Sequence, residues 1–405
     1  MKILLALSRF PWPTDKGDKL RAWNHILGLS EHHEVHLFCL SDEHVNTSSI
    51  NKVKEVVSSV NLFQLGKISC ISRLLLNAFS NKPMQVAYFS DALAIKKFKE
   101  LGKQISPDLT VVQLARMAEF GKESSGKKMI DYQDAFSKGL ERRMQHNPWW
   151  MKGILKLEYE RLKAYESKIF NEFEIATIIS KQDAELIHHE NNSDLVILPN
   201  GVDTDYYKPE PRAKTLDLLF TGNMGYQPNV NCVKYVVDDV LPLLHKEFPH
   251  LQFVAAGKEP SAELKRIKNR HLQLTGWVDD LRSYYQQSRI FVAPMQIGIG
   301  MQNKILEAMA MGLPVITSTL ANNAIGAKHG KEVWIADSPE KVAEGIAYLL
   351  NNTELAISIG QNARNLMVAE FSWNKQNKRL NRLVSFRSED SDNYQKQNNT
   401  YTKRS

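Results

Sequence analysis

Short apolar runs alternate with helical patterns along most of this 405-residue chain, and this alternation limits the fold more than any other feature. The order is typical of β-α-β units around a parallel sheet. A first series of predicted strands covers residues 3–7, 35–40, 62–65, 109–114, 128–130, 175–179 and 195–198, and a second covers 218–221, 252–256, 272–275, 290–293, 315–317 and 333–336. We therefore predict an α/β fold with two doubly wound, Rossmann-like domains.

The two series are separated by an irregular stretch that begins at Pro199. Asn200 and Gly201 mark a turn, and a Pro-containing segment continues to Arg212. A chain of 405 residues also exceeds what one hydrophobic core usually holds. We expect an N-terminal domain over 1–199, an interdomain linker over 200–212, a C-terminal domain over 213–370, a C-terminal helix over 371–387 and a disordered polar tail over 388–405.

The formal net charge of +7 and the pI near 9.0 indicate an anionic partner. Nucleic acid, phosphorylated substrates and an acidic membrane face all fit, as does a charge that only serves solubility. The sequence has no long Lys/Arg block and no aromatic-basic RNA signature. Small phosphates or a membrane are therefore favoured over nucleic acid.

The cysteine usage predicts a reducing compartment. Cys39, Cys70 and Cys232 are far apart and form no CxxC pair, so they indicate neither a disulfide framework nor a zinc site. The start, from Met1 to Leu7, is too short for a signal-peptide core, and no apolar run approaches the ~20 residues of a membrane span. We expect a cytoplasmic protein and leave open a location at the inner face of the membrane.

The stretch from Gly298 to Pro314 predicts a tight turn, a helix and a stop before the next strand. On a helix that starts near Gly300, Lys304 and Glu307 share one face. Backbone N–H groups and the ammonium of Lys304 suit phosphate, and the carboxylate of Glu307 one turn deeper suits sugar hydroxyls. Together they would hold a nucleotide diphosphate; the alternative is a solvated ion pair between the two side chains.

Each early strand of the second series ends in a glycine turn, at Gly222, Gly257 and Gly276. Such turns let a ligand approach the backbone at the carboxyl edge of a sheet, although left-handed geometry alone would also favour glycine. Their repetition favours the ligand.

In the first domain, a charged loop from Pro11 to Arg21 and two acids after the fifth strand stand at strand ends, where a substrate can bind. A plain surface loop is the alternative for the first of these. Asp131 and Asp134 can orient an acceptor hydroxyl or serve as a base, and Asp134 can instead cap the next helix.

Two further motifs have ordinary explanations. Trp149 and Trp150 precede a long helix, and core packing is favoured over contact with a membrane interface or a greasy acceptor. Asp203 and Asp205 form a DxD pattern in the predicted linker, which is weak support for a metal, and we expect no metal site.

Three segments resemble retaining glycosyltransferases of family four: PNGVD at 199–203, TGWVDD at 275–280 and EAMAMGLPV at 307–315. FTGNM at 220–224 and the segment 13–21 with its KGDK are similar to the bacterial branch associated with exopolysaccharide biosynthesis. The resemblance covers nearly the whole chain up to the tail. It implies the GT-B fold, with two Rossmann-like domains facing each other across a cleft, the nucleotide-sugar donor on the second and the acceptor on the first.

The resemblance also implies site residues. Glu307 matches the glutamate that holds the ribose hydroxyls, whereas Ile299 stands where the family's first glutamate would fall. Many members carry an Arg and a Lys at 223–231 and a histidine near 111–116; both are lacking here, and Lys304 replaces the former. The implied donor-binding residues are Gly17, Gly222, Asn223, Val278, Gly300, Met301, Gln302, Lys304 and Glu307, and the acceptor-side residues are Asp18, Lys19, Arg21 and Asp134.

We therefore expect a retaining, metal-independent hexosyltransferase without cofactor, in which Asp131 and Lys304 are catalytic. It would move a sugar from a nucleotide-diphosphate sugar to a hydroxyl of a glycan or lipid-linked acceptor in polysaccharide or glycoconjugate biosynthesis. The alternatives are a sugar-nucleotide epimerase of the same fold and a non-enzymatic protein that binds an anionic surface. No nucleic-acid partner is expected, and peripheral membrane contact is left open.

Overall fold

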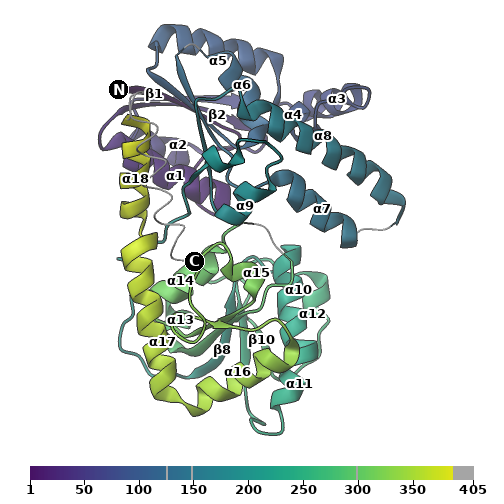
Figure 1. Cartoon of the computed structure of the whole chain (residues 1–405), viewed down its shortest axis with the longest axis vertical. Coiled ribbons are helices and arrows are strands. Elements are labelled where there is room, and N and C mark those ends of the chain that lie inside the picture. The colour runs from purple at the N-terminus through teal and green to yellow at the C-terminus, as the bar shows by residue number, and fades with distance from the viewer. Residues whose placement is uncertain (125, 147–148, 298–299, 386–405) are drawn as a thin grey trace. The chain divides into compact units, whose positions relative to one another are not determined.

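The computed structural model describes residues 1–124, 126–146, 149–297 and 300–385 (Figure 1). The chain divides into two compact units. The first comprises Met1–Pro199 and the chain from Gln376 onward, and the second comprises Asn200–Lys375. No helix among the described residues is long and apolar enough to cross a membrane.

The first unit is built on a parallel sheet of seven strands in the order β3-β2-β1-β4-β5-β6-β7. The strands are β1 (Lys2–Leu7), β2 (Glu34–Ser41), β3 (Ser59–Gln64), β4 (Leu109–Gln113), β5 (Lys127–Asp131), β6 (Ile175–Ile178) and β7 (Val196–Ile197). The helices are α1 (Gly17–Ser30), α2 (Thr47–Lys54), α3 (Lys67–Asn77), α4 (Met84–Phe89), α5 (Ala92–Ile105), α6 (Ala118–Lys122), α7 (Phe136–His146), α8 (Lys152–Phe170) and α9 (Lys181–Leu186).

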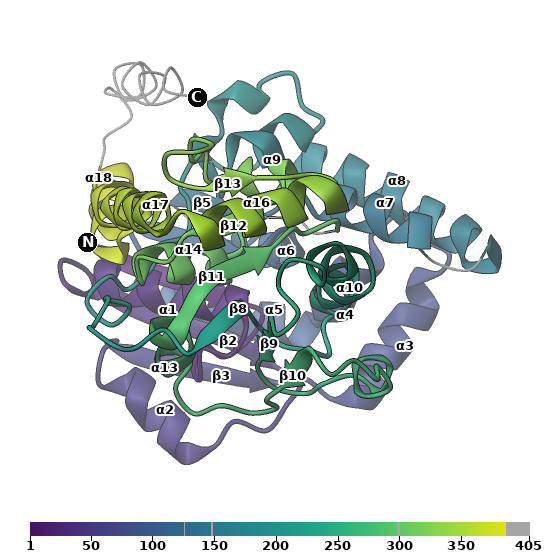
Figure 2. The same cartoon turned by 90° about the horizontal axis from the view of Figure 1, so that it is seen from below.

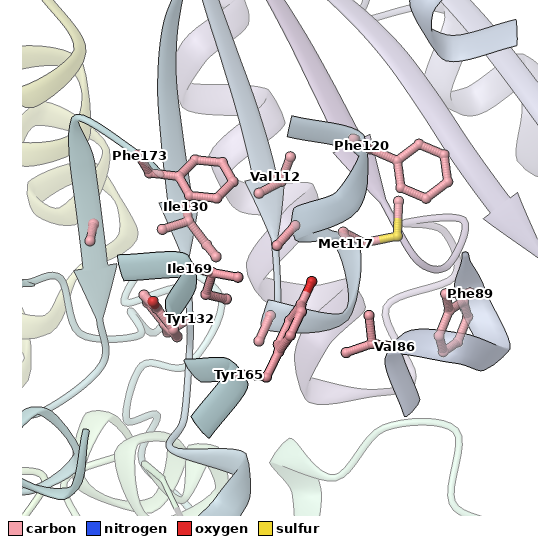
Figure 3. Close-up of a cluster of buried hydrophobic side chains, with 14 of the residues drawn as sticks. Val86, Phe89, Val112, Met117, Phe120, Ile130, Tyr132, Tyr165, Ile169 and Phe173 are labelled. Atoms are coloured by element: carbon pink, nitrogen blue, oxygen red, sulfur yellow. The ribbon is translucent and has the colours of Figure 1, made fainter. Parts of the chain in front are cut away.

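Strand β1 shows why the first sheet reads as continuous apolar runs. Ile3 and Leu5 belong to a hydrophobic cluster with helices α1 and α2, whereas Leu4 and Ala6 belong to a cluster with α5, α6 and α8 (Figure 3). A parallel strand covered by helices on both faces has no solvated side and therefore needs apolar residues at every position.

The second unit is built on a parallel sheet of six strands in the order β10-β9-β8-β11-β12-β13 (Figure 2). The strands are β8 (Leu216–Thr221), β9 (Phe253–Ala256), β10 (Leu272–Leu274), β11 (Ser288–Ala293), β12 (Val315–Thr317) and β13 (Trp334–Ile335). The helices are α10 (Gln227–Tyr235), α11 (Leu241–Leu244), α12 (Ala262–Lys265), α13 (Arg282–Gln287), α14 (Asn303–Ala310), α15 (Thr319–Asn322), α16 (Pro339–Asn351) and α17 (Thr353–Leu366). Both strand orders reverse direction after the first strand of the unit, as in doubly wound folds, so the predicted fold class is confirmed.

The predicted linker over 200–212 differs from the structure, because these residues pack on the second unit. The backbone N–H of Val202 donates to the carbonyl of Phe371 at 2.7 Å. Arg364 donates to the carbonyls of Tyr207, at 2.6 Å, and Thr204, at 2.9 Å. The half-buried guanidinium of Arg364 thus holds this segment on the second unit, although its turn residues and prolines predicted a free linker.

The C-terminal helix also differs in its assignment. Helix α18 (Trp373–Ser385) belongs to the first unit from Gln376 onward. Its residues Leu380 and Val384 join the cluster that contains α1, and Asn381 donates to the carbonyl of Gly28 at 2.8 Å. The predicted disordered tail over 388–405 lies outside the described residues.

Trp149 and Trp150 do not pack in a core. They lie just before α8 and are 82% and 63% exposed, so the favoured prediction for this pair was wrong. The short one-turn helix that carries them leaves both rings on the surface of the first unit.

Candidate functional site

The carboxyl edge of the second sheet carries the predicted glycine turns. Gly222 follows β8 and Gly257 follows β9, with φ values of +149° and +145°. A Cβ atom on Gly257 would lie 1.8 Å from the carbonyl oxygen of Gly222, and one on Gly222 would lie 3.3 Å from Cε of Lys304 and 2.7 Å from Nδ2 of Asn229. Glycine at both turns therefore permits a close approach of backbones beside Lys304. Gly276 has nothing within 4 Å of such an atom, and its φ of +70° alone accounts for glycine there.

Lys304 is held at this edge by three groups. Its Nζ atom donates to Oδ1 of Asn229 at 2.6 Å and to Oε1 of Gln302 at 3.2 Å, and it lies 5.1 Å from the centre of the Phe220 ring. Burial lowers the pKa of Lys304 to about 8. All of these partners are neutral, so the ammonium carries a charge that an anionic ligand can compensate.

The turn before α14 contains the residues that the resemblance assigns to the donor. Gly300 adopts a φ of +66°, Met301 is buried, and Gln302 takes the N-cap position of the helix. Gly298 and Ile299, where the family's first glutamate would fall, lie outside the described residues.

The start of α14 offers two backbone donors next to Lys304. In the described part of the chain, the backbone N–H groups of Asn303 and Lys304 have no acceptor, and the side chain of Asn303 accepts from Nδ2 of Asn200 at 3.1 Å. Unpaired N–H groups at a helix start, beside an ammonium, form an anion-binding arrangement.

Glu307 lies one turn further along α14 and is held by two tyrosines. The hydroxyl of Tyr285 donates to its Oε2 atom at 2.9 Å and lies 2.7 Å from Oγ1 of Thr221, and Tyr207 also hydrogen-bonds the carboxylate. Burial raises the pKa of Glu307, which these hydrogen bonds oppose. No ion pair joins Glu307 to Lys304 among the described residues, which excludes the solvated pair that was the alternative.

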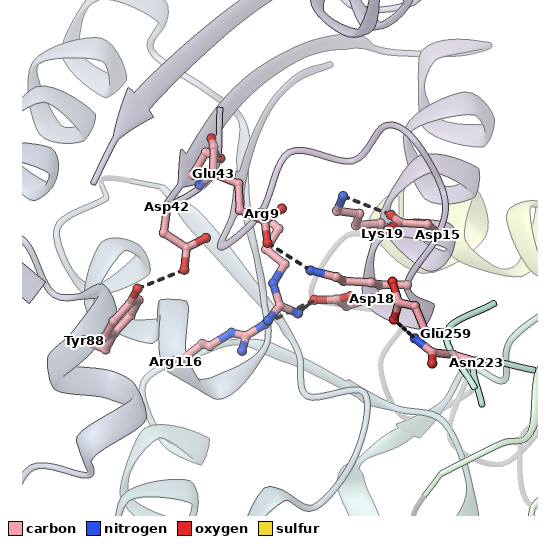
Figure 4. A network of polar contacts seen from close by, with 12 residues as sticks. Arg9, Asp15, Asp18, Lys19, Asp42, Glu43, Tyr88, Arg116, Asn223 and Glu259 are labelled. Carbon is pink, nitrogen blue, oxygen red and sulfur yellow. Dashed lines mark hydrogen bonds and ion pairs between the residues drawn. The ribbon is translucent and has the colours of Figure 1, made fainter. Parts of the chain in front are cut away.

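Asn223 and Val278 stand at the same edge of the sheet. The side chain of Asn223 donates to Oε2 of Glu259 at 3.1 Å and accepts from the backbone N–H of Gly225 at 2.7 Å, which fixes the turn after β8 (Figure 4). Val278 is half-buried in the loop after β10. The second unit therefore gathers its predicted donor-binding residues along one sheet edge.

In the first unit, the carboxylate of the predicted catalytic residue Asp131 forms an ion pair with Arg21. The guanidinium donates from Nε to Oδ2 at 2.7 Å and from Nη2 to Oδ1 at 2.9 Å, and the hydroxyl of Thr177 donates to Oδ1 at 3.0 Å. The side chains of Arg21 and Asp131 are 0% and 2% exposed. The two side chains thus form a buried ion pair between α1 and β5, and the roles of Asp131 as a base and of Arg21 as an acceptor contact stay predictions.

Asp18 is held between two arginines (Figure 4). Its Oδ2 atom accepts from Arg9 at 2.7 Å and from Arg116 at 3.2 Å, and its backbone carbonyl accepts from Gln113 at 3.1 Å. Burial lowers the pKa of Arg116 to about 10, and Arg9 acts in the same direction. The charges of Asp18 and Asp42 oppose this lowering, so two guanidinium groups and two carboxylates lie near the carboxyl end of β4.

The remaining residues of the N-terminal loop occupy the start of α1. Gly17 is the first residue of this helix, and Lys19 donates to Oδ1 of Asp15 at 3.0 Å. The loop is thus cross-linked by its own charges, and Gly17 and Lys19 stay predictions for substrate contact.

Asp134 differs from its neighbour Asp131. It follows Gln133, whose φ is +60°, and its Oδ1 atom is buried without a hydrogen-bond partner. Burial raises its pKa to about 7, and the charge of Asp183 acts in the same direction. Among the described residues no backbone N–H of α7 donates to Asp134, so a capping role has no support.

Three residues at these edges were not foreseen. Asn229 lies in the segment 223–231, which lacks the family's Arg and Lys, Tyr285 lies 22 positions before Glu307, and Arg116 follows β4 where a histidine was sought. Arg116 had a signal in the sequence, its position directly after a strand, and Asn229 had one in the family resemblance, which includes Asn229 together with FTGNM.

The DxD pattern forms a turn. Asp203 accepts through Oδ1 from the backbone N–H groups of Asp205, at 3.1 Å, and Tyr206, at 2.9 Å. Over the described ranges, no three His, Cys, Asp or Glu side chains gather as a metal site would need.

Two curated proteins are similar to this chain in sequence. A mannosyltransferase of Mycobacterium tuberculosis, named GDP-mannose-dependent alpha-(1-6)-phosphatidylinositol monomannoside mannosyltransferase, is 28% identical over 203 residues, 44% of this chain and 52% of that protein. The chain thus spans about half the length of this relative. An uncharacterised 44.6 kDa protein of the cps region of Klebsiella pneumoniae is 21% identical over 89% of this chain and 94% of that protein.

Solved structures and a family profile agree with the geometry. The Anabaena protein HepE in complex with UDP superposes with a TM-score of 0.70 over 95% of this chain and 100% of that one, at 14% identity. The profile described as "Glycosyl transferases group 1" matches residues 215–352, which contain β8 to α16 and the whole Lys304 region. The chain therefore has the GT-B fold, and the part of its second unit from residue 215 to 352 is similar to the group 1 glycosyl transferases.

Proposed function

We propose that this chain is a retaining glycosyltransferase that moves a sugar from a nucleotide-diphosphate sugar to a hydroxyl of a glycan or lipid-linked acceptor. The observation that carries this proposal is the arrangement at α14, where the buried ammonium of Lys304 and two unpaired backbone N–H groups stand beside the glycine turns. These groups suit a diphosphate, and Glu307 suits the hydroxyls of the attached ribose.

The proposed chemistry breaks the bond between the sugar's anomeric carbon and the diphosphate oxygen, and forms a bond from that carbon to the acceptor oxygen. Negative charge develops on the departing diphosphate. Lys304 and the N–H groups at the start of α14 are aimed before the reaction begins, so they stabilise this charge without reorganisation. The ammonium supplies the positive charge that a divalent metal would otherwise supply.

On the acceptor side, Asp134 takes over the role that was predicted for Asp131. Its Oδ1 atom lacks a partner and its pKa of about 7 lets it exchange a proton near neutral pH. We assign it to orient the attacking hydroxyl, together with Asp18 and Lys19 of the N-terminal loop.

The names of the similar proteins support particular classes of donor and acceptor. The mannosyltransferase is named for a GDP-mannose donor and a phosphatidylinositol-linked acceptor, and HepE was solved with UDP. The Klebsiella relative lies in a cps region, which supports a role in surface polysaccharide biosynthesis. We propose a purine or uridine diphosphate sugar as donor, an acceptor linked to lipid or glycan, and action at the inner face of the membrane.

A thermal-shift screen against UDP-, GDP- and ADP-sugars tests the donor class. A ligand at about 100 times its Kd stabilises the folded state by about 2.7 kcal/mol, which raises the melting temperature of a domain of this size by about 5–10 °C. One nucleotide should produce this shift and the other two should not. Isomerisation of the donor in the absence of any acceptor would identify an epimerase instead.

Removing the Glu307 carboxylate should weaken donor binding. Hydrogen bonds to a charged group contribute about 1.5–3 kcal/mol, so Glu307→Ala should raise the Kd for the donor about 10- to 100-fold. Titration calorimetry measures this change. The matched control is Glu344→Ala, an exposed glutamate on α16 of the same unit, which should bind as the wild type does. Equal affinity of both variants would remove Glu307 from the donor site.

Donor affinity should depend on pH through Lys304. Its pKa of about 8 lies below the usual value for lysine, so the ammonium is present below pH 8 and is lost above it. The Kd for the donor should be flat on the acid side of 8 and rise toward about tenfold per pH unit on the alkaline side. In Lys304→Arg the guanidinium stays charged, and the alkaline rise should disappear. The same alkaline rise in both proteins would contradict a charge at this position.

A further inference from the structure

An apolar row runs along the exposed face of α3 in the first unit and continues to Phe79, just after the helix. Its five residues are 59% to 97% exposed, with Phe79 the most exposed: Ile68, Ile71, Leu75, Leu76 and Phe79. The spacing of Ile68, Ile71, Leu75 and Leu76 places these four on one face of α3, opposite the buried Cys70 and Asn77, and Phe79 follows two residues after the helix ends. The helix thus packs through the side that carries Cys70, a member of a hydrophobic cluster, and leaves the opposite apolar face exposed.

A second apolar row begins at the exposed tryptophans. Trp149 and Trp150 are followed on α8 by Ile154 and Leu157, which are also exposed. Leu157 lies one helical turn before Arg161, and Nη2 of Arg161 donates to the carbonyl of Ala78 at 3.2 Å.

A second hydrogen bond links α8 to the segment that follows α3. Oε1 of the buried Glu158 accepts from the backbone N–H of Met84 at 2.6 Å, shortly after the end of α3. Both views place α3 and α8 on the same side of the first unit (Figures 1 and 2). The two rows therefore form one surface, which we call the α3–α8 patch.

Positive charges predominate around this patch, and the first exposed acid of α8 is Glu160, three residues beyond Leu157. Residues 66–90 and 147–157 contain no Asp or Glu. Lys67, Lys152 and Lys156 are exposed and form no ion pair within the described chain. A rim of lysines around tryptophans and branched aliphatic residues is complementary to anionic lipid headgroups above an acyl layer.

The composition of the patch favours a lipid membrane over another protein as its partner. Protein–protein interfaces are depleted in lysine and usually carry charges of both signs at the rim. Tryptophan and lysine together are typical of the membrane–water interface, where the indole lies at headgroup depth and the ammonium reaches the phosphates.

We propose that the α3–α8 patch docks the first unit onto the surface of an anionic membrane. The apolar rows enter the interfacial layer, and the three lysines bind the lipid phosphates. This inference goes beyond the transfer of the sugar and does not depend on which donor is used.

Co-sedimentation with vesicles tests the proposal. The full chain should bind vesicles of phosphatidylglycerol mixed with phosphatidylethanolamine, and bind vesicles of phosphatidylcholine far less. The double variant Phe79→Ser/Trp149→Ser should lose about 100-fold in affinity, because each buried aromatic side chain contributes about one order of magnitude or more. The charge variant Lys152→Glu/Lys156→Glu should lose binding to the anionic vesicles, and added salt should weaken binding of the wild type.

A control variant shows whether the effect is specific to the patch or follows from the loss of any exposed apolar side chains. Leu243→Ser/Tyr348→Ser removes two exposed apolar residues of the second unit and should bind vesicles as the wild type does. All variants should keep the thermal shift with the donor, so failure of docking is distinct from failure of the donor site. Wild-type protein that ignores anionic vesicles would overturn the proposal. So would a wild-type dimer in light scattering that Phe79→Ser/Trp149→Ser converts to a monomer, because the patch would then join two copies.

Discussion

Lys304→Ala should lower the turnover number about 100- to 1,000-fold, the range seen when one preorganised donor to a developing oxyanion is removed. The reason lies in the surroundings of the ammonium. Its partners Asn229 and Gln302 are neutral, so no other cation in the described contacts of Nζ can replace it against the departing diphosphate. Steady-state kinetics with saturating donor and acceptor measure the effect.

Separate values of kcat and KM show whether the Lys304 ammonium acts on donor binding alone or on the transition state. A contact that is equally strong in the ground state and the transition state would raise KM alone, whereas a contact that strengthens as charge develops on the diphosphate lowers kcat as well. Lys234→Ala is the matched control, since Lys234 lies on α10 of the same unit and pairs with Glu263 on the surface. A Lys304→Ala enzyme with the kcat of the control would contradict the proposed mechanism.

The strands could be predicted from the sequence because both sheets are buried on two faces. Leu4 and Leu5 face opposite clusters, so the whole of β1 must be apolar and stands out between helical patterns. The same holds for β8 and β11 at the centre of the second sheet, where Leu219 and Phe291 are fully buried. Each of the predicted strands overlaps an observed one.

The residues at the carboxyl edge of the second sheet could be predicted because they lie close to strand ends in the sequence. Gly222, Gly257 and the start of α14 follow strands directly, and parallel strands deliver their carboxyl ends to one edge. Sequence spacing on a single helix also places Lys304 and Glu307 on one face. Their partners Asn229 and Tyr285 come from other elements, so no periodicity in the sequence links them.

The first unit was harder to predict because its pairings are distant. Arg21 and Asp131 are 110 positions apart, and the sequence predicted separate roles for them, Arg21 on the acceptor side and Asp131 in catalysis, rather than a pair. The prediction that Trp149 and Trp150 pack in a core was wrong because large apolar residues are usually buried, and local sequence does not reveal whether another element covers them.

Asp131→Ala should destabilise the first unit by about 3–5 kcal/mol, because it leaves the guanidinium of Arg21 buried without its carboxylate. The Arg21 charge lowers the pKa of Asp131 despite burial, so the carboxylate's contribution is present at neutral pH and is lost as the pH falls below its unfolded-state pKa of about 4. Urea unfolding followed by circular dichroism should show an earlier transition for the first unit and an unchanged one for the second, as expected where two units unfold separately.

The double variant Arg21→Met/Asp131→Leu separates a structural pair from a catalytic one. Replacing both charges by apolar groups of similar volume removes the desolvation cost together with the attraction, so it should recover most of the stability that Asp131→Ala loses. If the pair only positions α1 against β5, the refolded double variant should also recover turnover, whereas a base at Asp131 would leave both variants inactive. Stable but inactive protein in both cases would restore Asp131 as the catalytic base, and recovered turnover would leave Asp134 as the acid that orients the acceptor.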